Sequence, residues 1–326
     1  MNSKFIIFIA SLFITINGFS QTTLLDSVSG QPVSFATVSF GNGNGLFADD
    51  DGKFTFTKKL YSDIDSLFVS ALGYKDLNLA TSTLKDTLFL APKSDLLDEV
   101  IVTAKPTGKF KEITIKPVEH DDYFKCWLPT IESEIAVFFP NTDTKPKRLT
   151  KILLPIKTED KDFKKRGSSK KKRPFSTLFR VQFYENNNGF PGDVLTYEKI
   201  VFIATENTKP VFEFNVSSHD IFIPKSGLFV SIQVMGYTNT NGKLLPNKKY
   251  QEVKTRRGTV KISTTFRPLL PFTDAISEKK TFVKRVFLNG GEWVLFDKTN
   301  IKNSNLLNAS LNNYGMGLKM EVYKNQ

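Results

Sequence analysis

Three acidic residues followed by a glycine form the first group that could do chemistry. Asp49, Asp50 and Asp51 precede Gly52, and closely spaced carboxylates beside a glycine turn are ligands that a hard cation such as Ca²⁺ favours. The group lacks the alternating ligands and the distant bidentate glutamate of an EF-hand loop. We therefore expect a hairpin turn with solvated acids rather than a calcium site.

The two histidines and the single cysteine form the second group. His120 and His219 are each followed by Asp, and two histidines with carboxylate help can hold Zn²⁺, but neither belongs to an i, i+4 pair or lies beside a cysteine. Cys126 would need an adjacent base to act as a nucleophile, and its neighbours Phe124, Trp127 and Leu128 instead indicate packing. We predict no metal site and no bound cofactor.

A pair of carboxylates facing a cleft would be the minimum for an enzyme that cleaves glycans. Glu132 and Glu134 lie two residues apart in a strand-like run, on the same face, without a partner motif. The sequence also lacks a Gly-x-Ser-x-Gly elbow and a Walker phosphate loop. It therefore predicts no catalytic residue, and we expect a protein that is not an enzyme.

The most basic segment spans residues 161–173, where eight positive residues and one Asp leave a net charge of +7 out of +12 for the whole chain. Such cations can contact anionic lipid headgroups, at about 1 kcal/mol per contact. A solvated loop without a dedicated ligand is the alternative. Because the charge is confined to one segment, we expect anionic lipid or lipopolysaccharide rather than nucleic acid as its partner. The candidate contact residues are Lys164, Lys165, Arg166, Lys170, Lys171, Lys172 and Arg173.

Residues 1–20 have the pattern of a secretory signal peptide. Lys4 precedes the apolar run Phe5 to Ile16, and the small residues Gly18 and Ser20 stand before the expected cleavage point. We therefore expect an exported protein that is periplasmic or associated with the outer membrane. Cys126 is the only cysteine, so no intrachain disulfide can form, and stability must come from burial.

Short β-type runs and turn residues fill the rest of the chain, and with 40% hydrophobic residues, among them 30 Phe, it can form two cores. Apolar residues alternate in residues 179–183 and 228–234, as half-buried strands require. Residues 180–192 read as a strand, a wide turn, a Pro-Gly turn and a second strand. The strands that we expect span residues 33–40, 53–57, 67–72, 87–90, 135–139, 149–156, 178–184, 194–203, 211–216, 228–234, 281–288, 292–296 and 317–323.

Residues 24–104 carry a family resemblance. The series Gly30 to Val38, Asp50 to Phe54 and Asp65 to Tyr74 resembles the carboxypeptidase-regulatory-like domain of Bacteroidota. This resemblance implies a transthyretin-like β-sandwich over residues 21–96 that has no catalytic residues of its own. Leu97 to Ala104 resembles the linker that leads into TonB-linked receptors, but the roughly 222 residues that follow are too few for a 22-stranded barrel.

The expected architecture is all-β. A transthyretin-like sandwich is followed by a linker at residues 97–110 and by a larger jelly-roll-like sandwich at residues 111–326, whose Phe138, Phe139, Phe175, Phe179, Phe183 and Phe190 belong to the core. The expected function is interaction within the cell envelope, with an envelope protein or an outer-membrane complex as partner. A glycan-binding or glycan-processing surface protein and a small outer-membrane β-barrel are the alternatives.

Overall fold

The computed structural model describes residues 21–41, 43–93, 108–160, 172–246, 250–255, 258–288 and 291–324, and the expected signal peptide lies outside them. The described residues are nearly all β, and the predicted all-β sandwich class is confirmed. No helix among them is long and apolar enough to cross a membrane.

The first group of strands forms a small sandwich. Its sheets have the strand orders β4-β1-β7 and β3-β2-β5-β6, and between them lies a core that contains Leu24, Val38, Phe54, Leu67 and Val69. The elements are β1 (Gln21–Asp26), β2 (Thr37–Ser39), β3 (Gly45–Phe47), β4 (Lys53–Thr55), β5 (Ser66–Ser70), β6 (Leu77–Ala80), η1 (Thr81–Thr83) and β7 (Thr87–Leu90).

The turn between β3 and β4 depends on Gly52. Its φ is +70°, and a Cβ atom there would lie 2.6 Å from the Leu24 carbonyl oxygen. Only glycine combines this left-handed backbone with so close an approach. The turn therefore sets the register that buries Phe54, and Phe56 two residues on.

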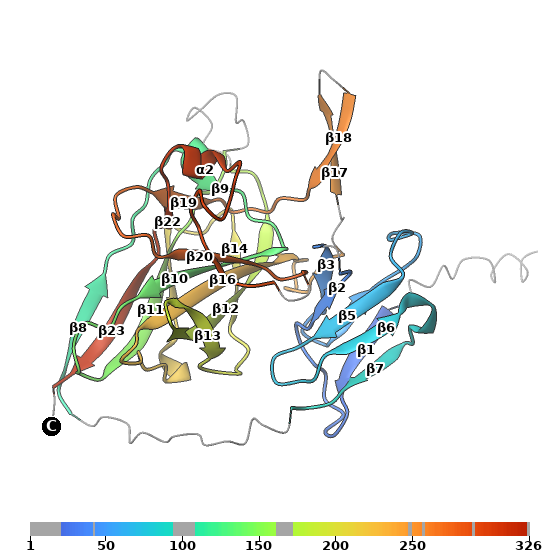
Figure 1. Cartoon of the computed structure of the whole chain (residues 1–326), viewed down its shortest axis with the longest axis horizontal. Coiled ribbons are helices and arrows are strands. Elements are labelled where there is room, and N and C mark those ends of the chain that lie inside the picture. Colours follow the sequence, from blue (N-terminus) through green and yellow to red (C-terminus); the bar gives the residue numbers. More distant parts are fainter. Residues whose placement is uncertain are drawn as a thin grey trace, which may run out of the picture.

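The second group of strands forms a larger sandwich, beside the small one in Figure 1. The elements of this part of the chain are β8 (Phe110–Ile115), η3 (Tyr123–Lys125), β9 (Cys126–Trp127), β10 (Ser133–Phe139), β11 (Lys147–Pro155), β12 (Ser176–Asn187), β13 (Phe190–Val194), β14 (Val201–Thr205), β15 (Val211–Asn215), η5 (Ser217–His219), β16 (Leu228–Tyr237), β17 (Tyr250–Thr255), β18 (Gly258–Ser263), β19 (Leu270–Thr273), β20 (Thr281–Arg285), β21 (Val294–Leu295), α2 (Asn305–Asn308), β22 (Asn313–Tyr314) and β23 (Gly317–Tyr323).

Two main sheets make this larger sandwich. One is seven-stranded, with the order β13-β12-β16-β10-β20-β21 and with β14 also paired to β12, and the other has the order β15-β11-β23-β8. A short sheet of β22, β19 and β9 lies beside them. The β17–β18 hairpin stands away from both sandwiches (Figure 1).

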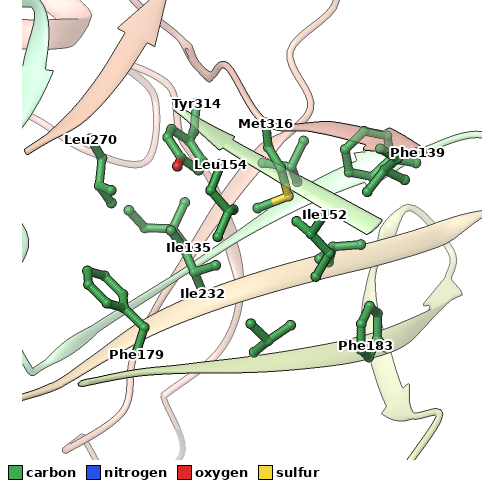
Figure 2. Packing of buried hydrophobic residues seen from close by; sticks show 14 of the residues in the cluster. Ile135, Phe139, Ile152, Leu154, Phe179, Phe183, Ile232, Leu270, Tyr314 and Met316 are labelled. Atoms are coloured by element: carbon green, nitrogen blue, oxygen red, sulfur yellow. The ribbon is translucent and has the colours of Figure 1, made fainter. Parts of the chain in front are cut away.

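The core of the larger sandwich lies between these sheets. Figure 2 shows Phe179 and Phe183 of β12 and Ile232 of β16 pointing toward Ile152 and Leu154 of β11. The fully buried Tyr314 packs in the same core, and its hydroxyl donates a 2.8 Å hydrogen bond to the Pro155 carbonyl. Every second side chain of the long strands therefore points into the core, and the side chains between them point to the opposite face of the sheet.

The predicted single strand over residues 194–203 is wrong. β13 ends at Val194 and β14 begins at Val201, because the residues between them form a turn in which the Thr196 hydroxyl accepts a 3.1 Å hydrogen bond from the Glu198 amide. The resulting loop carries Tyr197 over the outer face of the sheet.

The predicted Pro-Gly turn in residues 180–192 is also wrong. The hairpin between β12 and β13 turns at Asn188 and Gly189, which have φ values of 52° and 89°, as a tight two-residue turn requires. Pro191 instead lies in β13, an edge strand of the sheet, where its missing N–H is tolerated. Phe110, which we expected in the linker, opens β8 and pairs with Tyr323; most of that linker lies outside the described residues.

Candidate binding cavity between the two sandwiches

The outer face of the seven-stranded sheet carries an unusual group of polar side chains. Glu134 of β10 lies opposite Gln233 of β16 on one side and Lys284 of β20 on the other. Gln233 in turn lies opposite Arg180 of β12. Adjacent strands thus bring together residues far apart in sequence. We call the group the polar cluster, and its members are Glu134, Arg180, Gln182, Tyr184, Ser231, Gln233 and Lys284.

The small sandwich covers part of this face. Phe35 and Phe47 pack against Leu178, Met235 and Phe287 of the larger sandwich, and the Phe47 and Phe287 ring centroids are 5.1 Å apart. This contact excludes water from an apolar area, which is the main favourable contribution to such an interface. It therefore fixes the two sandwiches against each other.

The acidic turn of the small sandwich adds ion pairs to this contact. The Lys243 Nζ lies 3.3 Å from Asp49 Oδ2 and 3.1 Å from Asp51 Oδ2, and the hydrogen bond and charge of Lys243 lower the pKa of Asp51. Lys199 pairs with Asp50. Asp49 is 5% exposed, and its Oδ1 also accepts hydrogen bonds from the Asp51 and Lys53 amides. The expectation of solvated acids is therefore wrong for Asp49.

A cavity of about 420 Å³ remains between the sandwiches. This volume falls in the range of about 300–1,000 Å³ that is typical of small-molecule sites, which often form where domains meet. The small sandwich contributes Thr37 of β2 and Ser70 of β5, and the loop before β14 contributes Tyr197. The larger sheet contributes Glu134, Arg180, Gln182, Tyr184 and Lys284.

Hydrogen bonds hold the Glu134 carboxylate at the cavity. Its Oε1 accepts one from the Tyr184 hydroxyl at 2.8 Å and one from the Ser231 hydroxyl at 2.5 Å. Burial, reinforced by the charge of Glu134, raises the pKa of Tyr184 well above its usual value, so the hydroxyl keeps its proton. The Tyr184 hydroxyl also lies 3.0 Å from Gln182 Oε1, and because it has one proton it can donate to only one of Glu134 and Gln182 at a time.

Arg180 lies at the β12 end of the cross-strand row Arg180–Gln233–Glu134–Lys284 and has incomplete hydrogen bonding. Its guanidinium donates to the Gln233 side-chain oxygen and, at 3.4 Å, to the Phe35 carbonyl, and it lies 5.6 Å from the centroid of the Phe47 ring. Among the described side chains, Arg180 Nε and Gln233 Nε2 are buried without a hydrogen-bond partner. Buried polar groups are nearly always paired, so these two atoms mark the site as unusual.

Aromatic rings flank the polar cluster on the same outer face. Tyr184 packs edge-on against Trp293 at 5.5 Å, and Phe138 packs on Phe229 at 4.8 Å. The prediction that Phe138 and Phe190 belong to the core is wrong, because Phe138 faces outward and Phe190 is 48% exposed. The core positions of Phe139, Phe179 and Phe183 are confirmed, and Phe175 packs at the edge of that core.

The histidines and the cysteine lie outside this site. His120 Nε2 lies 2.8 Å from the Phe272 carbonyl oxygen, and His219 contacts the Glu198 carboxylate. Cys126 is buried as predicted, and burial raises the pKa of its thiol to about 12. Within the part of the chain that the structure describes, no three His, Cys, Asp or Glu side chains lie together as metal ligands.

The basic tract does not line the cavity at the positions that the structure describes. The Lys172 Nζ pairs with Asp160 at 2.8 Å, and the Arg173 amide donates to the Glu159 carbonyl at 3.0 Å. The contact of the tract with anionic lipid stays a prediction. The other proposed contact residues lie outside the described residues; they are Lys164, Lys165, Arg166, Lys170 and Lys171.

Of the residues that line the cavity, only Glu134 was a candidate site residue from the sequence. Its partner in that hypothesis, Glu132, is not among the residues that line the cavity, and its carboxylate lies 4.0 Å from Arg285. In the sequence, the other polar residues appear only as the polar positions of alternating strands. This pattern places them on the outer face of the sheet but does not show that they are neighbours. They are Arg180, Gln182, Ser231 and Gln233.

No family model matches the chain, and no curated protein matches it. Among solved structures, it is similar to the cysteine protease and lectin-like domains of a surface-layer-associated protein of Clostridium difficile, with 11% identity and a TM-score of 0.32. The match covers 58% of the present chain and 32% of that one, so it spans about a third of that chain. The resemblance to the carboxypeptidase-regulatory-like family stays a prediction.

One prediction is corrected by this finding. The matched structure contains a cysteine protease domain, and the prediction that the present chain is not an enzyme is therefore not retained. At this TM-score the similarity assigns no activity to the present chain.

Proposed function

We propose that the chain is an exported binding protein of the bacterial cell envelope, whose ligand occupies the cavity between its two sandwiches. The signal-peptide pattern of residues 1–20 and the family resemblance of residues 24–104 support the location. Association with the outer membrane, through an envelope protein or an outer-membrane complex, belongs to the same proposal.

The cavity is the observation that carries the proposal. Both sandwiches line it, so a ligand there would contact both and would strengthen their association. The site is polar where typical small-molecule pockets are mainly apolar, and Glu134, Arg180 and Lys284 are among the side chains that line it. The ligand that fits is therefore a small polar compound.

Filling the cavity tests the proposal. Ser70 lines the cavity, and Ser66 lies on the same strand but is exposed and outside it. We expect native mass spectrometry, after incubation with a small-molecule extract of the envelope, to detect a bound compound on the wild-type protein and on Ser66→Trp. Ser70→Trp should lose it, since the indole occupies the space. Equal retention by both variants, or no bound compound on any of them, would contradict the proposal.

A further inference from the structure

We infer that the cavity binds a carbohydrate through its hydroxyl groups. This inference rests on the proposed function and names the class of its ligand. It is drawn from the balance of donors and acceptors at the cavity, from its charges and from one exposed aromatic ring.

The cavity offers hydrogen-bond donors and acceptors side by side. Glu134 supplies a carboxylate that only accepts, whereas Arg180 and Lys284 supply groups that only donate. The side chains of Gln182, Thr37 and Ser70 can do both. A hydroxyl group also donates and accepts, so a compound with several adjacent hydroxyls can satisfy both kinds of partner within one small volume.

Charge disfavours the simplest ionic ligands. Glu134 and Asp193 line the same cavity as Arg180, Lys284 and Lys93, so a compact anion would lie near carboxylates and a compact cation near ammonium and guanidinium groups. A predominantly uncharged, polar ligand avoids both repulsions. Neutral sugars meet this condition, and a sugar with one carboxylate meets it nearly as well because the basic side chains that line the cavity slightly outnumber the acidic ones.

Arg180 is poorly placed to bind the carboxylate of an amino acid or peptide. Such recognition uses two parallel N–H bonds from the guanidinium fork. In this structure one terminal nitrogen bonds the Gln233 side chain, the other bonds the Phe35 carbonyl, and Nε is enclosed. Single hydrogen bonds from the remaining guanidinium hydrogens suit a hydroxyl better than a carboxylate.

Tyr197 completes the site. It lines the cavity, and its side chain is 54% exposed on the loop between β13 and β14. The C–H faces of a pyranose ring are apolar and pack on aromatic rings, for which tyrosine offers a flat surface with a polar end. The loop that interrupts the predicted strand over residues 194–203 therefore positions the Tyr197 ring at the cavity.

A glycan array probed with the labelled full-length mature protein tests the inference. Neutral and uronic-acid saccharides form separate arms, which identify the source of the hydroxyls. We expect a saccharide of one arm to bind, with affinity at least tenfold lower for Gln182→Ala and for Tyr197→Ala. Glu185→Gln, on the same strand as Gln182 but exposed and outside the cavity, should bind like wild type, and circular dichroism checks that each variant is folded.

The outcomes separate this inference from the proposed function. An array without signal, or equal binding by wild type and both cavity variants, overturns the carbohydrate inference. If the mass-spectrometric experiment still shows a compound that Ser70→Trp loses, the cavity is a binding site for another class, such as an amino acid or peptide. If neither experiment shows binding, the proposed function fails as well.

Discussion

Glu134 shows how strand register decides the role of a single side chain. Glu132 and Glu134 lie two residues apart, but only Glu134 lies opposite Gln233 and Lys284 in the sheet. Its carboxylate therefore accepts hydrogen bonds from the Tyr184 and Ser231 hydroxyls. A buried carboxylate costs much free energy unless it is hydrogen-bonded. The two hydroxyls meet that requirement while the carboxylate still lines the cavity.

Cys126 gives a prediction about a single residue. Burial raises its thiol pKa from an ordinary value near 9 to about 12, so the reactive thiolate is scarce in the folded protein at pH 8. We expect iodoacetamide to label Cys126 slowly in the native protein and rapidly in urea, as mass spectrometry would record. Equal labelling rates in the two states would contradict the burial.

The same shift predicts a dependence on alkaline pH. A folded-state pKa above the unfolded value means that the contribution to stability is complete below about pH 9 and is lost as the pH rises toward 12. Between these values the free energy of unfolding should fall less steeply for Cys126→Ser than for wild type. Parallel slopes in denaturation experiments at stepped pH would show that the thiol does not contribute.

At the scale of the element, the β2–β3 hairpin and the turn that follows β20 hold the two sandwiches together. The Phe287 ring packs so closely on Gly45 that a Cβ there would lie 2.4 Å from Phe287 Cδ1. The Ser39 hydroxyl donates a 2.7 Å hydrogen bond to the Phe287 carbonyl. Phe287 thus joins the turn after β20 to Ser39 of β2, which lies 248 residues earlier in the sequence.

Removing this ring should separate the sandwiches. Phe287 is fully buried, and Phe→Ala at such positions costs about 3–5 kcal/mol. We expect Phe287→Ala to lower the free energy of unfolding in urea by this amount and to make the two sandwiches unfold in separate transitions. Leu288→Ala is the control, since that side chain is 44% exposed. A similar, small effect of both changes would contradict the role of Phe287.

A strand or turn could be predicted from the sequence where its own residues show apolar alternation or turn-forming residue types. β12 and β16 follow from strict alternation, and the turn at Gly52 follows from its neighbours Asp49 to Asp51. The break between β13 and β14 was missed because Val194 to Ile203 contains enough β-branched residues to resemble one strand. β8 and β19 were missed as well, since their edge or short-sheet positions leave little periodicity.

The candidate site forms where the two sandwiches pack together, and neither sandwich forms it alone. Lys199 and Lys243 contact the acidic turn, and Phe35 and Phe47 cover the outer face of the larger sheet. The contact leaves a polar cavity between the sandwiches instead of closing completely. No local pattern predicts this cavity, because its walls come from strands whose relation is set only when the two sandwiches meet.

The most direct measurement is a crystal structure of the protein after it has been loaded with the compound retained in the mass-spectrometric experiment. We expect ligand electron density between the sandwiches, within hydrogen-bond distance of Glu134 and Arg180 and against the Tyr197 ring. Density for the compound elsewhere on the molecule, with this cavity holding only water, would contradict this expectation.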